Sequence, residues 1–177
     1  MAGVIWIKVL MPALFYSLVI IANGGTIAMY SNIVCAIDGS DLSTKAFTHA
    51  IALAGKLGAR LTAITVTEPS IIIAPGAEMM MVDTTSILEE LDKAKAESAK
   101  GVLEDATKLA SAAGINLTTQ HVPDLPAAEG IISSAKAVHA DLIVMGSHGR
   151  RGLGRLLLGS QAAEVLAHAD VPVLIIK

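Results

Sequence analysis

Aromatic residues and cysteine are scarce in this chain of 177 residues. Only 3% of the residues are Phe, Trp or Tyr, whereas 53% are hydrophobic, so a folded core must consist of Ala, Val, Ile and Leu. Aliphatic cores are typical of a parallel sheet that helices cover. The sole cysteine, Cys35, excludes an internal disulfide and fits a reducing compartment. Because Cys35 lies in an apolar run, we expect a buried core residue rather than a reactive thiol.

Excess positive charge is also missing. The 13 Lys and Arg residues are outnumbered by 16 Asp and Glu residues, and the formal net charge is -3. A basic footprint is the electrostatic sign of a nucleic-acid-binding domain, so the composition argues against nucleic acid as a partner. The five histidines are scattered without metal-ligand spacing, and no Gly-x-Ser-x-Gly nucleophile motif occurs. The length suits one domain with its own core.

The first 28 residues differ from the rest. They contain one charge, Lys8, and a dense apolar run from Val9 to Ala22. Three interpretations are open: a signal peptide, a membrane anchor over Met1–Ala22, or an apolar extension outside the functional domain. We favour the extension, with the domain spanning residues 29–177 in the cytoplasm, and keep the anchor as the alternative. Membrane contact is expected only if Met1–Ala22 is an anchor.

From residue 29 onward, short apolar runs alternate with segments of helical periodicity. The apolar runs predict five strands, at 33–37, 61–66, 117–122, 142–145 and 171–176. The periodic segments predict four helices, at 43–57, 85–113, 126–138 and 160–168. Strands that alternate with helices imply an α/β fold with a parallel sheet and right-handed crossovers. Residues 69–82 interrupt the pattern and predict a mobile loop.

Two details of the helices can be predicted. In the long helix, one face is expected to consist of Ile87, Leu91, Ala94, Ser98, Val102 and Leu109, with Glu and Lys on the other. Asp124 precedes the third helix, and we expect its side chain to cap that helix.

A glycine-rich stretch follows the fourth expected strand and leads into the last helix. Its spacing is Gly146, two residues, Gly149, nine residues, and then Gly159-Ser160. Glycine lets backbone approach a ligand closely, and the N–H groups at a helix N-terminus attract an anion. The stretch also contains arginines that match phosphate geometry, namely Arg150, Arg151 and Arg155. The pattern predicts a nucleotide held by its phosphates. A P-loop is excluded, because no lysine precedes Ser160.

Structural roles stay open for several of these residues. Asp38, after the first expected strand, could cap the following turn or coordinate Mg²⁺. Ser160 could be the helix N-cap as well as a phosphate contact. His148 could be a loop residue without a role, and the arginines could be solvated surface charges.

Three segments, in order and spacing, resemble the universal stress protein family. They are residues 32–40, the Gly-x2-Gly-x9-Gly-Ser stretch, which matches an ATP-binding signature, and residues 169–176. The resemblance covers residues 29–177. It implies a Rossmann-like α/β fold: a five-stranded parallel sheet of order 3-2-1-4-5, with helices on both faces. It also implies a nucleotide across the ends of the first and fourth strands, and a homodimer through the edge segment Val171–Ile176.

The resemblance also implies individual roles around the nucleotide. Asp38 would lie near the adenosine and ribose beside the backbone of Ala36 and Ile37, where some members have proline and threonine. Val66 would contact the adenine. The residues expected near the ribose and α-phosphate are Gly146, Ser147, His148 and Gly149. The residues expected at the β- and γ-phosphates are Gly159, Ser160 and Gln161.

We therefore expect a regulatory, stress-response module that binds ATP, ADP or AMP, with Mg²⁺ as a candidate ion at Asp38. Two alternatives remain open. One is a slow ATPase or adenylyl-transfer enzyme, although the Ser-Gly-Gly-x-Asp-Ser motif of related pyrophosphatase-type enzymes is absent. The other is a membrane-tethered interaction protein that does not depend on nucleotide. No catalytic residue is assigned, and any hydrolysis is expected to be weak.

Overall fold

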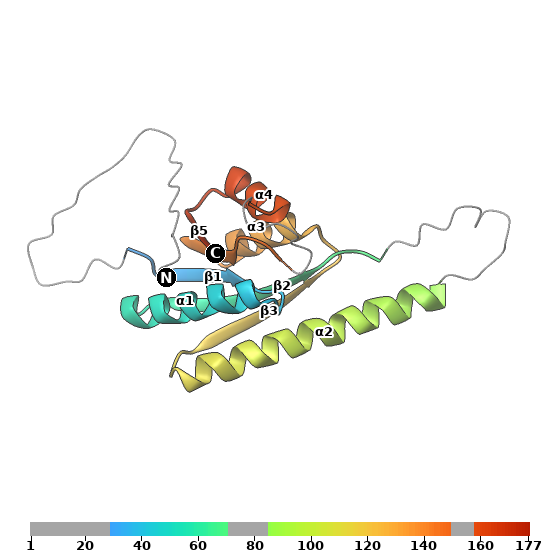
Figure 1. Cartoon of the computed structure of the whole chain (residues 1–177), viewed down its shortest axis with the longest axis horizontal. Coiled ribbons are helices and arrows are strands. Elements are labelled where there is room, and N and C mark those ends of the chain that lie inside the picture. Colours follow the sequence, from blue (N-terminus) through green and yellow to red (C-terminus); the bar gives the residue numbers. More distant parts are fainter. Residues whose placement is uncertain (1–28, 71–84, 150–157) are drawn as a thin grey trace, which may run out of the picture.

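A computed structural model describes residues 29–70, 85–149 and 158–177 (Figure 1). The expectations for the N-terminal extension, for residues 71–82 of the expected loop, and for Arg150, Arg151 and Arg155 lie outside these described residues. No helix within the described ranges is long and apolar enough to cross a membrane.

Nine elements alternate along the described chain. They are β1 (Asn32–Ala36), α1 (Asp41–Leu57), β2 (Arg60–Thr67), α2 (Thr85–Ala112), β3 (Leu117–Pro123), α3 (Ala127–Ala137), β4 (Leu142–Gly146), α4 (Ser160–His168) and β5 (Val173–Ile176). Every expected strand and helix is present, and no boundary differs by more than two residues from its expected position. Differences of this size are usual, because the ends of helices and strands are the least sharply defined positions of an element.

The strands form one parallel sheet in the order β3-β2-β1-β4-β5. β1 lies in the middle, where Val34 pairs with Thr62 of β2 on one side and with Ile143 of β4 on the other. The chain order therefore reverses between β1 and β4. In open α/β sheets, ligands bind outside the carboxyl ends of the strands at such a point.

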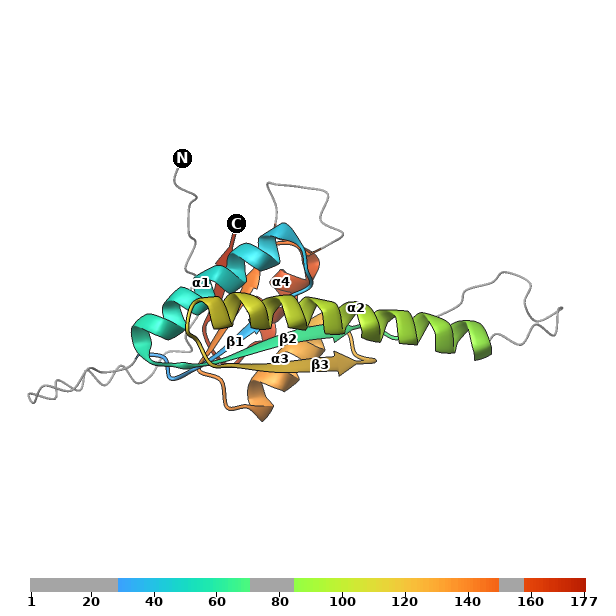
Figure 2. The ribbon, with the colours of Figure 1, turned by 90° about the horizontal axis from the view of Figure 1, so that it is seen from below.

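Helices cover both faces of the sheet (Figures 1 and 2). On one face, the aliphatic core joins the sheet to α1 and α2, with contributions from Phe47, Ala50, Ala106 and Ala110. On the other face, α3 and α4 pack through small and branched residues such as Ala128, Ile131, Ala162 and Val165. The fully buried Cys35 belongs to the first core, and burial raises the pKa of its thiol, as expected for a packing residue.

The face that α2 buries differs from the expected one. Its buried residues are Ala99, Ala106 and Ala110, and Val102 of the expected face packs partly buried against the same core. Ile87, Leu91 and Leu109, by contrast, are each nearly half exposed. In both views the N-terminal part of α2 extends past the ends of the neighbouring strands. For Ile87, Leu91 and Leu109 the prediction was wrong, because it followed the largest apolar side chains. Close packing of a helix on β2 and β3 instead selects the alanine face.

The start of α3 also differs from expectation. Its N-cap is Pro126, which makes no side-chain cap hydrogen bond, and Asp124 does not cap the helix. Asp124 has a left-handed backbone, with φ 57°. The first turn of α3 therefore needs an acceptor from elsewhere in the fold.

Asp141 joins the amino ends of β1 and β4. Its carboxylate accepts hydrogen bonds from the Ser31 N–H (2.7 Å), the Ser31 hydroxyl (2.7 Å) and the Asn32 N–H (3.0 Å). Partial burial by itself would raise the pKa of Asp141, but these hydrogen bonds outweigh burial and lower it. The two central strands are thus joined at the end of the sheet opposite the glycine-rich stretch.

Candidate functional site

The turn after β1 is built around Asp38. Its Oδ1 accepts a hydrogen bond from the Ser40 N–H at 3.0 Å, and its own N–H donates to the Ser43 hydroxyl at 3.3 Å. Gly39 follows with φ 81°, and Ser40 caps α1 by accepting from the Ser43 N–H. The turn-capping role considered for Asp38 is therefore present. It uses one carboxylate oxygen, Oδ1.

The backbone before Asp38 is held by β2. The Ile37 N–H donates to the Ile64 carbonyl at 2.9 Å, and the Thr65 hydroxyl donates to the Ile37 carbonyl at 3.0 Å. Ala36 ends β1 and is partly buried. These bonds give the carboxyl end of β1 a defined backbone position beside β2.

Ser147 anchors the loop that follows β4. Its N–H donates to the Ile176 carbonyl of β5 at 2.8 Å, and its carbonyl accepts from the Gly159 N–H at 2.9 Å. The side chain is 2% exposed, and its hydroxyl lies 3.1 Å from Nδ1 of His148. Ser147 thereby holds both ends of the glycine-rich stretch together, across eleven intervening residues of sequence.

Close approach explains the three glycines of the motif. A Cβ on Gly149 would lie 2.7 Å from Oδ2 of Asp38, and one on Gly159 would lie 3.0 Å from the Ser147 carbonyl oxygen. A Cβ on Gly146 would lie 3.2 Å from the backbone of Leu42 in α1. None of the three has a positive φ. The loops after β1 and β4 therefore meet at the switch point, with Asp38 against Gly149.

The N-terminus of α4 faces this loop region. Its N-cap is Gly159, and Ser160 is the first helical residue, so the expected N-cap role of Ser160 is wrong. The Ala163 N–H is the first to bond within the helix, to the Gly159 carbonyl. Helix geometry leaves the preceding N–H groups, those of Ser160, Gln161 and Ala162, without intrahelical acceptors. Such groups and the helix dipole attract an anion.

The Gln161 side chain lies against α3. Its Oε1 accepts a hydrogen bond from the Ala128 N–H at 2.9 Å and so supplies the acceptor that the start of α3 lacks. Sequence reasoning placed Gln161 at the phosphates. Its backbone N–H, at the N-terminus of α4, is free of an intrahelical acceptor and fits a phosphate contact. Its side-chain oxygen instead bonds to α3.

Val66 is partly buried near the carboxyl end of β2, and α3 packs closely against it. A Cβ on Gly130 of α3 would lie 2.6 Å from Cγ1 and 2.9 Å from Cγ2 of Val66. Sequence reasoning missed Gly130 and Leu42 as neighbours of the site. The available signal for Gly130 was a glycine inside a helix, where it costs about 1 kcal/mol relative to alanine and so indicates a packing constraint.

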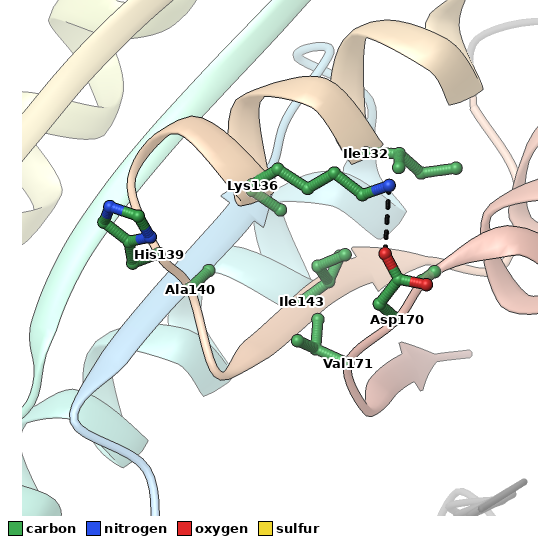
Figure 3. A pocket seen from close by; sticks show the side chains of 9 residues that line it. Ile132, Lys136, His139, Ala140, Ile143, Asp170 and Val171 are labelled. Atoms are coloured by element: carbon green, nitrogen blue, oxygen red, sulfur yellow. Dashed lines mark ion pairs between the residues drawn. The ribbon is translucent and has the colours of Figure 1, made fainter. Parts of the chain in front are cut away.

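A separate cleft lies at the opposite end of the sheet. It measures about 350 Å³ and is lined by residues that include Ile132, Lys136, Ile143, Asp170 and Val171 (Figure 3). Lys136 Nζ and Asp170 Oδ2 form an exposed ion pair of 2.9 Å beside it. In the described part of the chain, no group of three or more His, Cys, Asp or Glu side chains could hold a metal ion.

Comparison with known families identifies the chain. The sequence profile described as "Universal stress protein family" matches residues 29–177. The chain belongs to the universal stress protein family. Universal stress protein MJ0531 of Methanocaldococcus jannaschii is 38% identical over 158 residues, which cover 89% of this chain and 87% of that protein.

Solved universal stress proteins share the fold. UspA from Lactobacillus plantarum superposes with a TM-score of 0.72 and 31% identity over 84% of this chain and 98% of its own. Another universal stress protein, solved in complex with cAMP, has a TM-score of 0.60 and 27% identity and covers 84% of this chain and 98% of its own. The family resemblance and the sheet order expected from sequence are both confirmed.

Proposed function

We propose that this universal stress protein binds ATP, or a related adenine nucleotide, across the carboxyl ends of β1 and β4 and acts as a regulatory module in the stress response. The observation that supports this best is the meeting of Asp38 with Gly149 at the switch point of the sheet. At that place, a Cβ on Gly149 would lie 2.7 Å from Oδ2 of Asp38, so a larger residue would displace this carboxylate from the loop after β4.

The phosphates would bind along the glycine-rich stretch. Gly146, Ser147, His148 and Gly149 would approach the ribose and α-phosphate. The N–H groups of Ser160 and Gln161, after Gly159, would donate to the β- and γ-phosphates at the N-terminus of α4. Arg150, which follows Gly149 in the sequence, would add positive charge.

The adenine would lie on the β2 side. There Val66 offers an apolar contact, and the backbone of Ala36 and Ile37 is held in place by β2. The family relative solved with cAMP supports an adenine nucleotide as the ligand class. Asp38 would face the ribose and, together with phosphate oxygens, could ligate Mg²⁺.

Binding and regulation, rather than rapid turnover, fit these residues. Phosphoryl transfer needs a base or a group that positions the attacking water. The acidic side chain at this loop, Asp38, uses one oxygen to hold the turn after β1. We also propose that the domain works in the cytoplasm as a homodimer.

The proposal is tested by identifying the bound ligand and then substituting the glycines that would line its binding site. Mass spectrometry of the small molecules released from purified, unheated protein should show an adenine nucleotide. Calorimetry should show ATP binding to the wild type and loss of at least roughly tenfold in affinity in Gly149→Val plus Gly159→Val, since added side chains block close approach. Unchanged affinity would remove this site.

A matched control is Gly101→Val on α2, where nothing lies within 4 Å of an added Cβ and ATP affinity should stay at the wild-type value. A phosphate-release assay separates regulation from catalysis. Turnover well above roughly one per minute would favour an enzyme instead.

A further inference from the structure

The first turns of α3 and α4 are joined by the Gln161 side chain. Ala128 is 1% exposed, and its N–H belongs to the first turn of α3, where helix geometry provides no acceptor. Pro126 supplies no side-chain cap, and the carboxamide oxygen of Gln161 accepts this N–H at 2.9 Å. Removing that oxygen would leave a buried donor unpaired, which is costly.

The same turn of α3 sets the space around Val66. The Gly130 N–H donates to the Pro126 carbonyl at 2.9 Å, so Gly130 belongs to the turn that Gln161 caps. Gly130 lies so close to Val66 that a Cβ would come within 2.6 Å of it. A small shift of this turn would therefore move the helix surface that borders the carboxyl end of β2.

We infer that Gln161 is a positioning residue that couples the phosphate end of the proposed site to its adenine end. This inference rests on the proposed nucleotide site. The backbone N–H of Gln161 belongs to the α4 N-terminus, whereas its side-chain oxygen accepts the Ala128 N–H in the first turn of α3, where Gly130 packs on Val66. The two helices lie side by side (Figure 1). The side chain thus acts on recognition of the base, through α3, rather than on the phosphates.

Comparing the binding of adenosine with that of ATP distinguishes an effect on recognition of the base from an effect on the phosphates. Gln161→Met keeps the length of the side chain and removes the acceptor. Affinity for adenosine, which has no phosphate, and for ATP should both fall by a similar factor of about five. Binding of the base must then restore the displaced turn of α3, at a cost of about one buried hydrogen bond. Gln161→Glu keeps an acceptor for the Ala128 N–H, so adenosine should bind within about twofold of wild type. ATP should bind more weakly, because the added negative charge lies in the first turn of the helix whose N-terminus would bind the phosphates.

The matched control is Gln120→Met on β3, which should leave both affinities unchanged. Titrations followed by calorimetry, or by competition with a fluorescent adenine nucleotide, give both constants. Hydrogen exchange of residues 127–131 in the ligand-free protein should be faster in Gln161→Met than in Gln161→Glu or wild type.

Three results would overturn the inference. Gln161→Met could weaken ATP while adenosine keeps its affinity, which assigns the side chain to the phosphates. It could leave both affinities unchanged. Or Gln161→Glu could lose adenosine and ATP equally, a result that decides the question even if Gln161→Met does not fold. Failure of the proposed function itself is distinguishable, because then wild-type protein binds neither ligand.

Discussion

At the scale of single residues, the glycines of the loop matter because they have no Cβ. Neither Gly149 nor Gly159 has a positive φ, and an added Cβ at these positions would lie 2.7 and 3.0 Å, respectively, from its nearest neighbouring atom. This differs from Gly39, whose φ of 81° favours glycine for conformational reasons. A single methyl group at Gly149 is therefore a direct probe of the contact between the two loops.

We expect Gly149→Ala to weaken ATP binding about fivefold, because the Asp38 carboxylate must turn away from its position. Thermal stability should change little, since Gly149 is exposed and the Asp38 side chain can move. Calorimetry and thermal melting measure the two effects. Wild-type ATP affinity in this variant would contradict a role for the Asp38–Gly149 contact.

At the scale of elements, α3 illustrates how packing overrides helix propensity. Gly130 is buried inside the helix, although alanine would form a better helix by about 1 kcal/mol. The stiff, β-branched Val66 side chain occupies the space that an alanine methyl would need.

Gly130→Ala should therefore lower the free energy of unfolding by about 1 kcal/mol, as overpacking outweighs the gain in propensity. Gly101→Ala, with open space around its Cβ, should raise the same free energy by about 0.5–1 kcal/mol. Urea denaturation measures both. A stabilised Gly130→Ala would mean that α3 does not press on Val66.

The joint between β1 and β4 predicts a pH dependence. The folded state lowers the pKa of Asp141 below its ordinary value of 3.8, so the folded state binds this proton more weakly than the unfolded chain does. The stability that the carboxylate contributes is complete above that value, and it is lost as pH falls through the lower folded-state pKa.

Asp141→Asn should lower the free energy of unfolding by about 1 kcal/mol at neutral pH, because the amide cannot accept all three hydrogen bonds. The difference in the free energy of unfolding between this variant and wild type should become smaller below about pH 4. Asp105→Asn, which breaks an exposed ion pair with Lys108, should change stability little at either pH. Denaturation curves across this pH range measure these free energies of unfolding. A difference between wild type and Asp141→Asn that does not change with pH would show that the carboxylate charge is unimportant.

At the scale of the whole molecule, β5 forms an edge of the sheet. Val173, Ile175 and Ile176 are already buried within one chain, whereas Leu174 is only partly buried. Among the described residues, no strand pairs with the outer side of β5. Edge strands of this kind tend to pair with another strand.

We predict a symmetric homodimer through Val171–Ile176. Light scattering at micromolar concentration should give twice the chain mass of 18.2 kDa. Residues 29–177 alone should also dimerise. The mass of a single chain would contradict this prediction.

The N-terminal extension calls for a separate measurement. Cell fractionation of the full chain and of residues 29–177 should place both in the soluble fraction if the domain works in the cytoplasm. Recovery of only the full chain with membranes would favour Met1–Ala22 as an anchor.

Much of the fold could be predicted because its signals are local. Apolar runs and helical spacing placed every strand and helix, and the glycine spacing indicated which loop follows β4. Two errors, the buried face of α2 and the missing Asp124 cap, depend on which segments meet in space, and so does the unforeseen bond from Gln161 to α3. Local periodicity contains no such information. The N-cap of α4 differs from expectation by one residue, because helix ends are poorly defined by sequence.

By itself, the sequence determined the alternating strands and helices, the parallel sheet and the glycine-rich loop after β4. Each of these depends on residues that are near one another in the chain. Only the tertiary structure decided that Gln161 caps α3, 33 residues away, and that Asp38 meets Gly149. Both contacts arise where parallel strands bring distant loops to one edge, so their geometry is set by packing of the whole sheet.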